Sequence, residues 1–300
     1  MEKRIHLIDA FTDEPLAGNA AGVVPDAAEL GESQQQAIAR ELAVSETAFL
    51  TDSERADRRI RYFTPTTEVD LCGHATIASH AHLFEKGEID AGTYTLETNV
   101  GVLDIEVESD GTVWMTQAEP RVERVDLAYD EVADALEIDH AALSDIGADL
   151  PLARASTGLP FLVVPVNFLA NLGTAEPDDG AIVDLCGSVD TTGLYAFTFD
   201  TLEPESTLHG RMFAPLAGVA EDPVTGTASG AVGAYLRDVD AFGPSELPEE
   251  MIFEQGHFLD RPGEVRVRVG EEVRVGGNAV RALSGRIAVP EREDDEIVEA

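Results

Sequence analysis

Residues 61–82 read RYFTPTTEVDLCGHATIASHAH, and residues 211–236 read RMFAPLAGVAEDPVTGTASGAVGAYL. Both stretches begin Arg-x-Phe-x-Pro, continue through acidic residues, and reach a glycine followed by small residues and an apolar run with helical spacing. This pattern predicts a strand, a proline-bearing turn, an acidic loop and a helix that begins at glycine. The chain therefore contains two copies of one structural unit, and we expect the rest of the fold to be arranged around them.

The two predicted helix starts are candidate anion sites. A helix N-terminus leaves backbone N–H groups unpaired and carries a partial positive charge, so two such starts could hold a carboxylate or stabilise an enolate-like charge. In a single copy, ordinary turn and capping chemistry would explain these residues equally well, but the repetition favours the functional interpretation. The candidate substrate-binding residues at the two starts are Gly73, Ala75, Thr225, Gly226 and Thr227.

The composition excludes several classes of partner. The chain of 300 residues has 20 basic and 58 acidic residues, a formal net charge of −38, and its two lysines are Lys3 and Lys86. Such a charge argues against nucleic acid and anionic membranes as partners. The acids are scattered along the chain, and 44% of the residues are hydrophobic, which disfavours a disordered acidic protein. We expect a globular protein of a halophile, because high salt screens the repulsion.

Several motifs are absent from the sequence, and their absence bears on the compartment and on the need for a cofactor. It has no apolar run of membrane-spanning length and no signal-peptide pattern at its beginning, so we expect a cytoplasmic protein. Neither Cys72 nor Cys186 has zinc-site spacing, and nucleotide-binding and metalloprotease motifs are absent. We therefore expect neither a cofactor nor a metal, and a reaction that acid and base groups can perform alone.

The order of predicted elements in the first half recurs in the second half. This predicts a duplicated α+β fold, with one half at 1–120, a second at 121–278, and a last strand at about 279–300 that packs back on the first half. A segment at 119–126 is predicted to be the linker, and we expect the site to lie between the halves. The predicted helices are 33–43, 73–85, 129–137, 141–146, 180–189 and the one that follows Gly226. The other predicted strands are 4–9, 48–51, 60–64, 94–98, 102–108, 112–116, 153–157, 161–166, 194–200, 207–214, 251–255, 264–269 and 272–275.

Three residues are candidates for the chemistry: Glu46, His74 and Asp222. Glu46 stands alone in an apolar neighbourhood, where it is either a strand-start residue with its head in water or a base whose pKa is raised by partial burial. His74 follows Gly73, and the positive end of the helix favours a neutral imidazole there, although a packed histidine is the alternative. Asp222 precedes a proline and either belongs to a turn or orients a polar group of the substrate. Weaker candidates of the same kind are Asn19, Asp70 and Glu221.

These residues lie in segments that resemble the PhzF-like (phenazine-biosynthesis-like) isomerases, a family with the diaminopimelate epimerase fold. The segments are DAFTDEPLAGNAAGVV at 9–24, SETAFL at 45–50, the two repeated stretches, STGLPFLVVPV at 156–166 and EQGHFLDRPGEVRV at 254–267. The resemblance covers nearly the whole chain. It implies two pseudo-symmetric domains, each a sheet or half-barrel around a central helix, with the active site in the cleft between them.

The resemblance also implies roles for particular residues. Family members are similar to cofactor-free isomerases, of which the named one acts on a dihydro-hydroxyanthranilate, and a homodimer is expected. Glu46 would remove and redeliver a proton, while His74 and Asp222 would hold polar groups of a small carboxylate-bearing substrate. The two helix starts would bind its carboxylate, and Thr227 stands where the family enzyme has a serine.

Two alternatives remain open. In the epimerases of this fold each half offers a cysteine at its helix start, but here Thr225 replaces the second one, so a symmetric two-thiol mechanism is not possible. Cys72 could still serve an amino-acid epimerase or racemase as one partner, or it could simply pack. The other alternative is a metabolite-binding protein that has the pocket without turnover.

Overall fold

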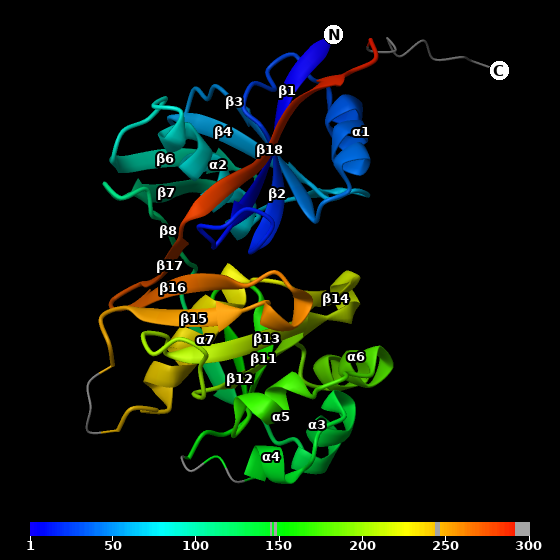
Figure 1. Cartoon of the computed structure of the whole chain (residues 1–300), viewed down its shortest axis with the longest axis vertical. Helices are drawn as coiled ribbons and strands as arrows, with labels where there is room; N and C mark the ends of the chain where they lie inside the picture. Colours follow the sequence, from blue (N-terminus) through cyan, green and yellow to red (C-terminus); the bar gives the residue numbers. More distant parts are fainter. Residues whose placement is uncertain (145, 147–148, 244–246, 292–300) are drawn as a thin grey trace, which may run out of the picture. The chain divides into compact units, whose positions relative to one another are not determined.

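The computed structural model describes residues 1–144, 146, 149–243 and 247–291, and the chain forms two units (Figure 1). The first unit comprises Met1–Leu16, Ala20–Val113 and the segment that begins at Asn278. The second unit comprises Ala17–Asn19 and Trp114–Gly277. None of the helices in the described part of the chain is long and apolar enough to span a membrane.

The first unit is a sheet packed against the central helix α2 (Gly73–Glu85), with α1 (Glu32–Leu42) packed on β3 and β4. Two neighbouring pairs in its sheet, β2–β3 and β4–β6, are parallel. The strands run in the spatial order β18 (Ala279–Ala288), β1 (Glu2–Ala10), β2 (Asn19–Val24), β3 (Glu46–Thr51), β4 (Arg58–Phe63), β6 (Gly92–Thr98) and β7 (Gly101–Val107), with β5 (Glu68–Val69) beside β4.

The second unit packs its sheet against α7 (Gly226–Asp238). Its strand order is β9 (Arg121–Arg124), β10 (Ala153–Ser156), β11 (Pro160–Pro165), β12 (Gly193–Thr198), β13 (Leu208–Ala214), β15 (Met251–Gln255), β16 (Gly263–Val269), β17 (Val273–Gly277) and β8 (Val113–Thr116), with β14 (Val219–Asp222) beside β13. The remaining helices are α3 (Tyr129–Leu136), α4 (Ala141–Ser144), α5 (Leu169–Gly173) and α6 (Asp179–Ser188). A hydrophobic core of this unit joins α3 and α6 to the sheet face that carries Leu162, Val164 and Leu194.

The two units have the same topology, as the repeated sequence predicts. In each sheet the third and fourth strands and the fifth and sixth strands are parallel pairs: β2–β3 and β4–β6, then β11–β12 and β13–β15. Both central helices have 13 residues and begin at glycine. In this comparison β18 occupies in the first unit the place that β9 occupies in the second. The predicted α+β fold with an epimerase-like duplication is confirmed.

Small residues let each sheet approach its central helix closely. In α2, Ala75 and Ala78 are fully buried, and Ser79 Oγ donates to Ala75 O at 2.7 Å, which satisfies a hydroxyl inside the core. In α7, a Cβ at Gly233 would come within 2.6 Å of Val267 on β16. The buried small-residue runs after both glycines are therefore requirements of packing.

The structure corrects several element predictions. The segment 119–126 is not a plain linker, because β9 lies within it and pairs with β10. Its sequence RVER carries charges that suit an edge strand. Because of these charges it lacks the apolar alternation by which a strand is predicted. The strand β2 and the short elements β5, β14 and α5 were not predicted. The predicted helix 141–146 ends at Ser144 as α4; residue 145 lies outside the described residues, as do 292–300 of the predicted last strand.

Candidate functional site

Three predicted or weighed residues of the first unit meet at the start of α2. Glu46 is the first residue of β3, Cys72 is the N-cap of α2, and His74 is the second residue of that helix. The carboxylate oxygen, the thiol sulfur and a ring nitrogen of these residues all lie within 4.8 Å of one another. Parts of the chain that are 26 residues apart are thus brought together by the packing of α2 against β3.

His74 lies between the other two side chains. Its Nε2 is 3.4 Å from Glu46 Oε2 and 3.3 Å from Ser45 Oγ, while its Nδ1 is 3.4 Å from Cys72 Sγ. With the proton on Nε2, the imidazole donates toward the Glu46 carboxylate and accepts at Nδ1 from the Cys72 thiol, so both ring nitrogens have a partner. The side chain of Glu46 is 22% exposed and that of His74 is 11% exposed. Both side chains are therefore partly desolvated and partly exposed to solvent.

The start of α2 itself offers positive potential. Cys72 makes no side-chain capping hydrogen bond, and the first turn of the helix contains no acidic residue. The partial positive charge of the helix N-terminus is therefore not neutralised by the helix's own side chains. A substrate carboxylate would be favoured at this position beside Gly73 and His74. Ala75 is fully buried, so it can contribute to such a site through its backbone and not its side chain.

The same three donors could in principle hold a metal ion, since carboxylate, thiolate and imidazole are all zinc ligand types. The helix N-terminus works against a cation at this position, because its dipole favours negative charge. A proton donor and acceptor pair uses the same residues without that conflict. The geometry therefore fits acid–base chemistry better than metal binding.

In the second unit, Asp222 fixes the turn that leads into α7. Asn19 Nδ2 donates to Asp222 Oδ1 at 2.9 Å and to Val224 O at 2.8 Å, and the hydroxyl of Thr225 donates to Asp222 Oδ2. Gln255 Nε2 donates to Asp222 O at 2.7 Å, and Gln255 Oε1 accepts from the Thr225 N–H at 3.2 Å. Both carboxylate oxygens thus hold the start of α7 in place.

The other predicted residues of this unit have mixed environments. Gly226 is buried at the first position of α7, and Thr227 is half-buried with its carbonyl accepting from Thr157 Oγ1 at 3.1 Å. Glu221, a weaker candidate, forms a two-point ion pair with Arg211 at 2.8 and 2.9 Å. Asp70, the other acid of that rank, is exposed.

The repeated Arg-x-Phe motif turns out to be structural in both units. Arg61 binds Glu68 through Nε at 2.7 Å and lies over the ring of Phe63, just as Arg211 binds Glu221 and lies over Phe213. The hydrogen bond from Arg61 holds the pKa of Glu68 below its ordinary value. The arginine, the aromatic ring and one acid of each copy therefore stabilise the loop before the central helix.

Two residues near these sites were not singled out from the sequence. Ser45 contacts His74, and Gln255 bridges Asp222 and Thr225. Both lie in segments of recognisable sequence, SETAFL and EQGHF, but a lone serine or glutamine carries no chemical signature by itself. Their positions depend on partners 29 and 30 to 33 residues away, which only the fold reveals.

Comparison with known structures first gives the class. The fold is similar to that of a hydroxyproline epimerase from Agrobacterium vitis, with a TM-score of 0.60 and 13% identity over 95% of this chain and 92% of that chain. This likeness concerns the fold alone. Together with the duplicated topology, it defines a two-unit protein of epimerase-like fold.

Sequence comparison then gives the family. The profile of the family described as "Phenazine biosynthesis-like protein" matches residues 8–285. The chain is 38% identical over 289 residues to "Uncharacterized isomerase YfhB" of Bacillus subtilis, covering 95% of each chain. A crystal structure of a phenazine biosynthesis protein of the PhzF family from Bacillus anthracis superposes with a TM-score of 0.87, at 32% identity, over 96% of this chain and 99% of that one. The chain belongs to the phenazine biosynthesis-like (PhzF) family, and it is an enzyme of the isomerase class.

Proposed function

We propose that this isomerase moves a proton on a small carboxylate-bearing metabolite, with Glu46 as both acid and base. The observation that carries the proposal is the placement of the Glu46 carboxylate 3.4 Å from His74 Nε2 at the start of α2. A carboxylate that is 22% exposed can reach a bound molecule while being partly shielded from water. The isomerase class disfavours the alternative of a binding protein without turnover.

The proposed reaction needs only groups of this chain. Glu46 takes a proton from a carbon near the substrate carboxylate, and the electrons of the broken C–H bond move into the conjugated system. The N-terminus of α2 stabilises the negative charge that develops there. Glu46 then returns the proton to a different carbon, so the product is an isomer and the enzyme is unchanged. His74 positions Glu46 through its Nε2–H.

A second candidate uses Cys72 as the proton carrier in an amino-acid epimerase or racemase. The observation that favours it is the contact of 3.4 Å between Cys72 Sγ and His74 Nδ1, since a neighbouring imidazole can deprotonate a thiol. Cys72 is 8% exposed, so the sulfur would have to meet the substrate at the helix start.

Solvent deuterium uptake tests both candidates in one experiment. The purified protein is incubated in D2O with a dihydro-hydroxyanthranilate, amino acids and related small acids, and C–H exchange or rearrangement is followed by NMR. We expect Glu46→Gln to slow exchange at least about 100-fold, the range of a lost general base. Glu41→Gln is the matched control, because Glu41 is an exposed carboxylate on α1 five residues away in sequence.

The outcomes separate the candidates. Full activity in Glu46→Gln on a substrate that the native protein turns over would refute the proposal. Loss of exchange in Cys72→Ser, with Glu46→Gln still active, would establish the thiol mechanism instead. Alkylation of the native protein with iodoacetamide should then abolish activity as well.

A further inference from the structure

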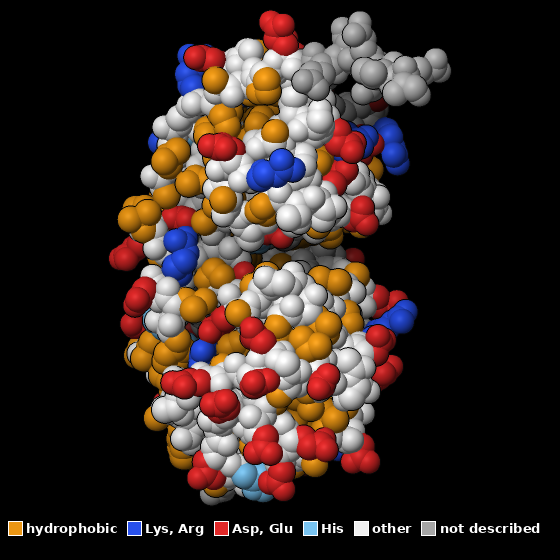
Figure 2. Space-filling view, turned by 90° about the vertical axis from the view of Figure 1, so that its right-hand side faces the viewer, with side chains coloured by type: hydrophobic (Ala, Val, Ile, Leu, Met, Phe, Trp, Pro, Cys, Tyr) orange, Lys and Arg blue, Asp and Glu red, His pale blue; other side chains and the backbone are white. Residues whose placement is uncertain are grey.

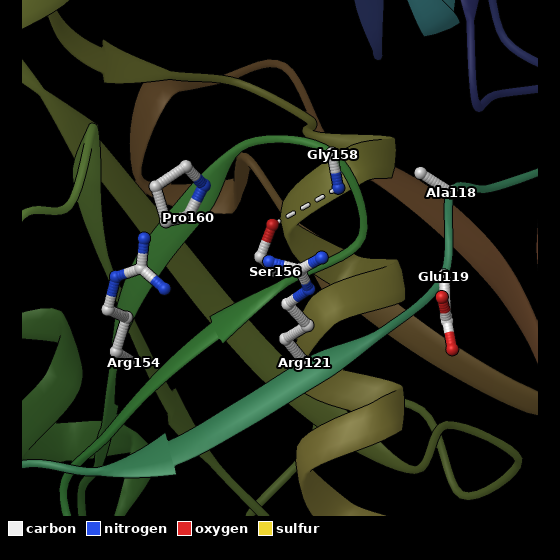
Figure 3. Close-up of a pocket in the computed structure, with 7 residues that line it drawn as sticks. All are labelled: Ala118, Glu119, Arg121, Arg154, Ser156, Gly158 and Pro160. Atoms are coloured by element: carbon white, nitrogen blue, oxygen red, sulfur yellow. Dashed lines mark hydrogen bonds between the residues drawn. The ribbon is translucent and has the colours of Figure 1, made fainter.

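A pocket of about 330 Å³ lies on the second unit, where β9, β10 and the turn between β10 and β11 meet (Figure 3). It is lined by two arginines, Arg121 and Arg154, together with Ser156, the backbone of Gly158, Pro160 and, at the end away from Arg154 in the view of Figure 3, Glu119. The volume falls at the lower end of the range for small-molecule sites. None of these residues takes part in the acid–base site of the first unit.

The strand register explains why the two arginines share one pocket. Arg121 on β9 pairs directly with Ser156 on β10, and Arg154 lies two residues before Ser156 on the same strand. Residues two apart on a strand point to the same face, so Arg121, Ser156 and Arg154 project together. The alternate residue between them, Ala155, is fully buried, which places the arginines on the outer face of the sheet.

Hydrogen-bond donors of this cluster remain available for a ligand. The N–H of Gly158 donates to Ser156 Oγ at 3.2 Å, which leaves the Ser156 hydroxyl proton free to donate elsewhere. Arg154 donates through Nε to the carbonyl of Asp190 at 3.0 Å, with Nη2 3.5 Å from its carboxylate, so this guanidinium is anchored in place. Its Nη1 has no hydrogen-bond partner among the described residues.

The side chain of Arg121 has no partner among the described residues. It is exposed and forms no hydrogen bond or ion pair with them, although the chain contains 58 acids. By contrast, Arg61, Arg211 and Arg266 are each paired with a glutamate at 2.9 Å or less. Arg121, the anchored Arg154 and the Ser156 hydroxyl therefore offer donors to one pocket, although Glu119 lines its far end and Glu123 pairs with Arg154 across the two strands.

We propose that this pocket binds a small dianion, namely a phosphate monoester or a dicarboxylate. Both kinds of ligand present paired oxygens that match the planar fork of a guanidinium, and Arg121 and the Nη1 of Arg154 offer donors to two such groups of oxygens. The net charge of −38 repels anions from most of the surface, so saturable binding of a small anion would require a local site of this kind.

Isothermal titration of the whole protein with inorganic phosphate, and separately with succinate, tests the proposal at constant ionic strength. We expect saturable binding to the native protein with at least one of the two ligands, weakened at least about tenfold in Arg121→Gln. Arg121 holds no described partner, so this variant should fold normally; Arg154→Gln should show the same loss. The matched control is Arg124→Gln, which removes the same charge from the same strand but from its other face.

The results decide the chemistry of the ligand as well. Binding of phosphate alone assigns a phosphorylated ligand, binding of succinate alone assigns a dicarboxylate, and binding of both assigns dianions in general. Succinate could also occupy the proposed catalytic site, but such binding would survive Arg121→Gln. Absence of saturable binding, or equal affinity in the native protein, Arg121→Gln and Arg124→Gln, would overturn the proposal.

Discussion

His74 stands between two groups that can carry a proton, and each ring nitrogen faces one of them. Because one nitrogen of a neutral imidazole donates and the other accepts, its tautomer decides which neighbour is held as an acceptor. With the proton on Nε2, Glu46 is kept as a carboxylate acceptor and Cys72 as a thiol donor. This assignment agrees with the proposal that Glu46 is the base and that Cys72 packs at the helix start.

His80, six residues after His74 on α2, is a buried residue whose protonation affects stability at low pH. Burial lowers its pKa from 6.5 to about 4, and its Nδ1–H donates to Thr76 O at 2.9 Å. Below pH 6.5 the His80 side chain binds a proton in the unfolded chain but not in the folded chain. The free energy of unfolding therefore falls as the pH falls. The loss for this residue should approach roughly 3 kcal/mol near pH ~4.

Urea unfolding at several pH values from about 7 down to about 4 measures this effect. His80→Asn keeps an N–H near Thr76 but does not titrate, so its stability should decline less steeply with falling pH than that of the native protein. His140→Asn is the control, since His140 is exposed. Parallel pH profiles for the native protein and His80→Asn would contradict the prediction.

At the scale of elements, the start of α7 is held by a network that joins distant segments. Asp222, Thr225, Asn19 and Gln255 share five hydrogen bonds and connect the turn after β14 to β15 and to residues more than 200 positions earlier in the chain. Charge-assisted hydrogen bonds of this kind are stronger than neutral ones. The network therefore fixes the helix start that the sequence marks as an anion site.

Thr225→Val tests how much this network stabilises the fold. The substitution removes the hydroxyl that donates to Asp222 and accepts from Gln255, so we expect the free energy of unfolding to fall by about 1.5–3 kcal/mol in urea unfolding. Thr93→Val on β6 is the control, because Thr93 is exposed and has no side-chain hydrogen bond among the described residues. A difference between the two variants below about 0.5 kcal/mol would show that the network contributes little.

Most helices and strands could be predicted from local sequence patterns. The elements that were missed depend on contacts between residues far apart in the chain. The two glycine-led helices were predictable because the small-residue runs that pack inside each sheet lie within one stretch. The strand β9 was missed because RVER lacks an apolar alternation, and its pairing with β10 crosses about 30 residues. The Asn19–Asp222 bond joins positions 203 residues apart, so chemistry at Asp222 could be suspected from the sequence but its partner could not.

At the scale of the whole molecule, corresponding strands of the two units occupy corresponding positions in their sheets. One of these positions is filled from different parts of the chain in the two units. The last described strand, β18, pairs with β1 in the first unit, as β9 pairs with β10 in the second. The strand that completes the first sheet therefore comes from the far end of the chain. Because β1 and β18 lie almost the full chain length apart, their pairing belongs to the long-range contacts that slow folding.

The net charge of −38 sets the response of the whole molecule to salt. Acidic side chains are spread over the face in Figure 2, and basic ones are few there. Mutual repulsion of these acids destabilises the compact state, and raising the salt concentration from about 0.1 M to about 1 M shortens the Debye length from ~10 Å to ~3 Å. We expect the melting temperature to rise with KCl, by roughly 2–4 °C for each kcal/mol of repulsion removed.

Thermal unfolding in KCl, compared with sucrose at equal osmolality, separates screening from general solvent exclusion. Sucrose stabilises proteins by exclusion from their surface and leaves charge repulsion in place, so a larger rise in KCl isolates the electrostatic part. The rise in KCl should be steepest below about 1 M, where the Debye length changes most. A melting temperature that is unchanged by KCl, or that follows the sucrose curve, would mean that the acids are too well dispersed to destabilise the fold, and the expectation of a halophile would lose its physical basis.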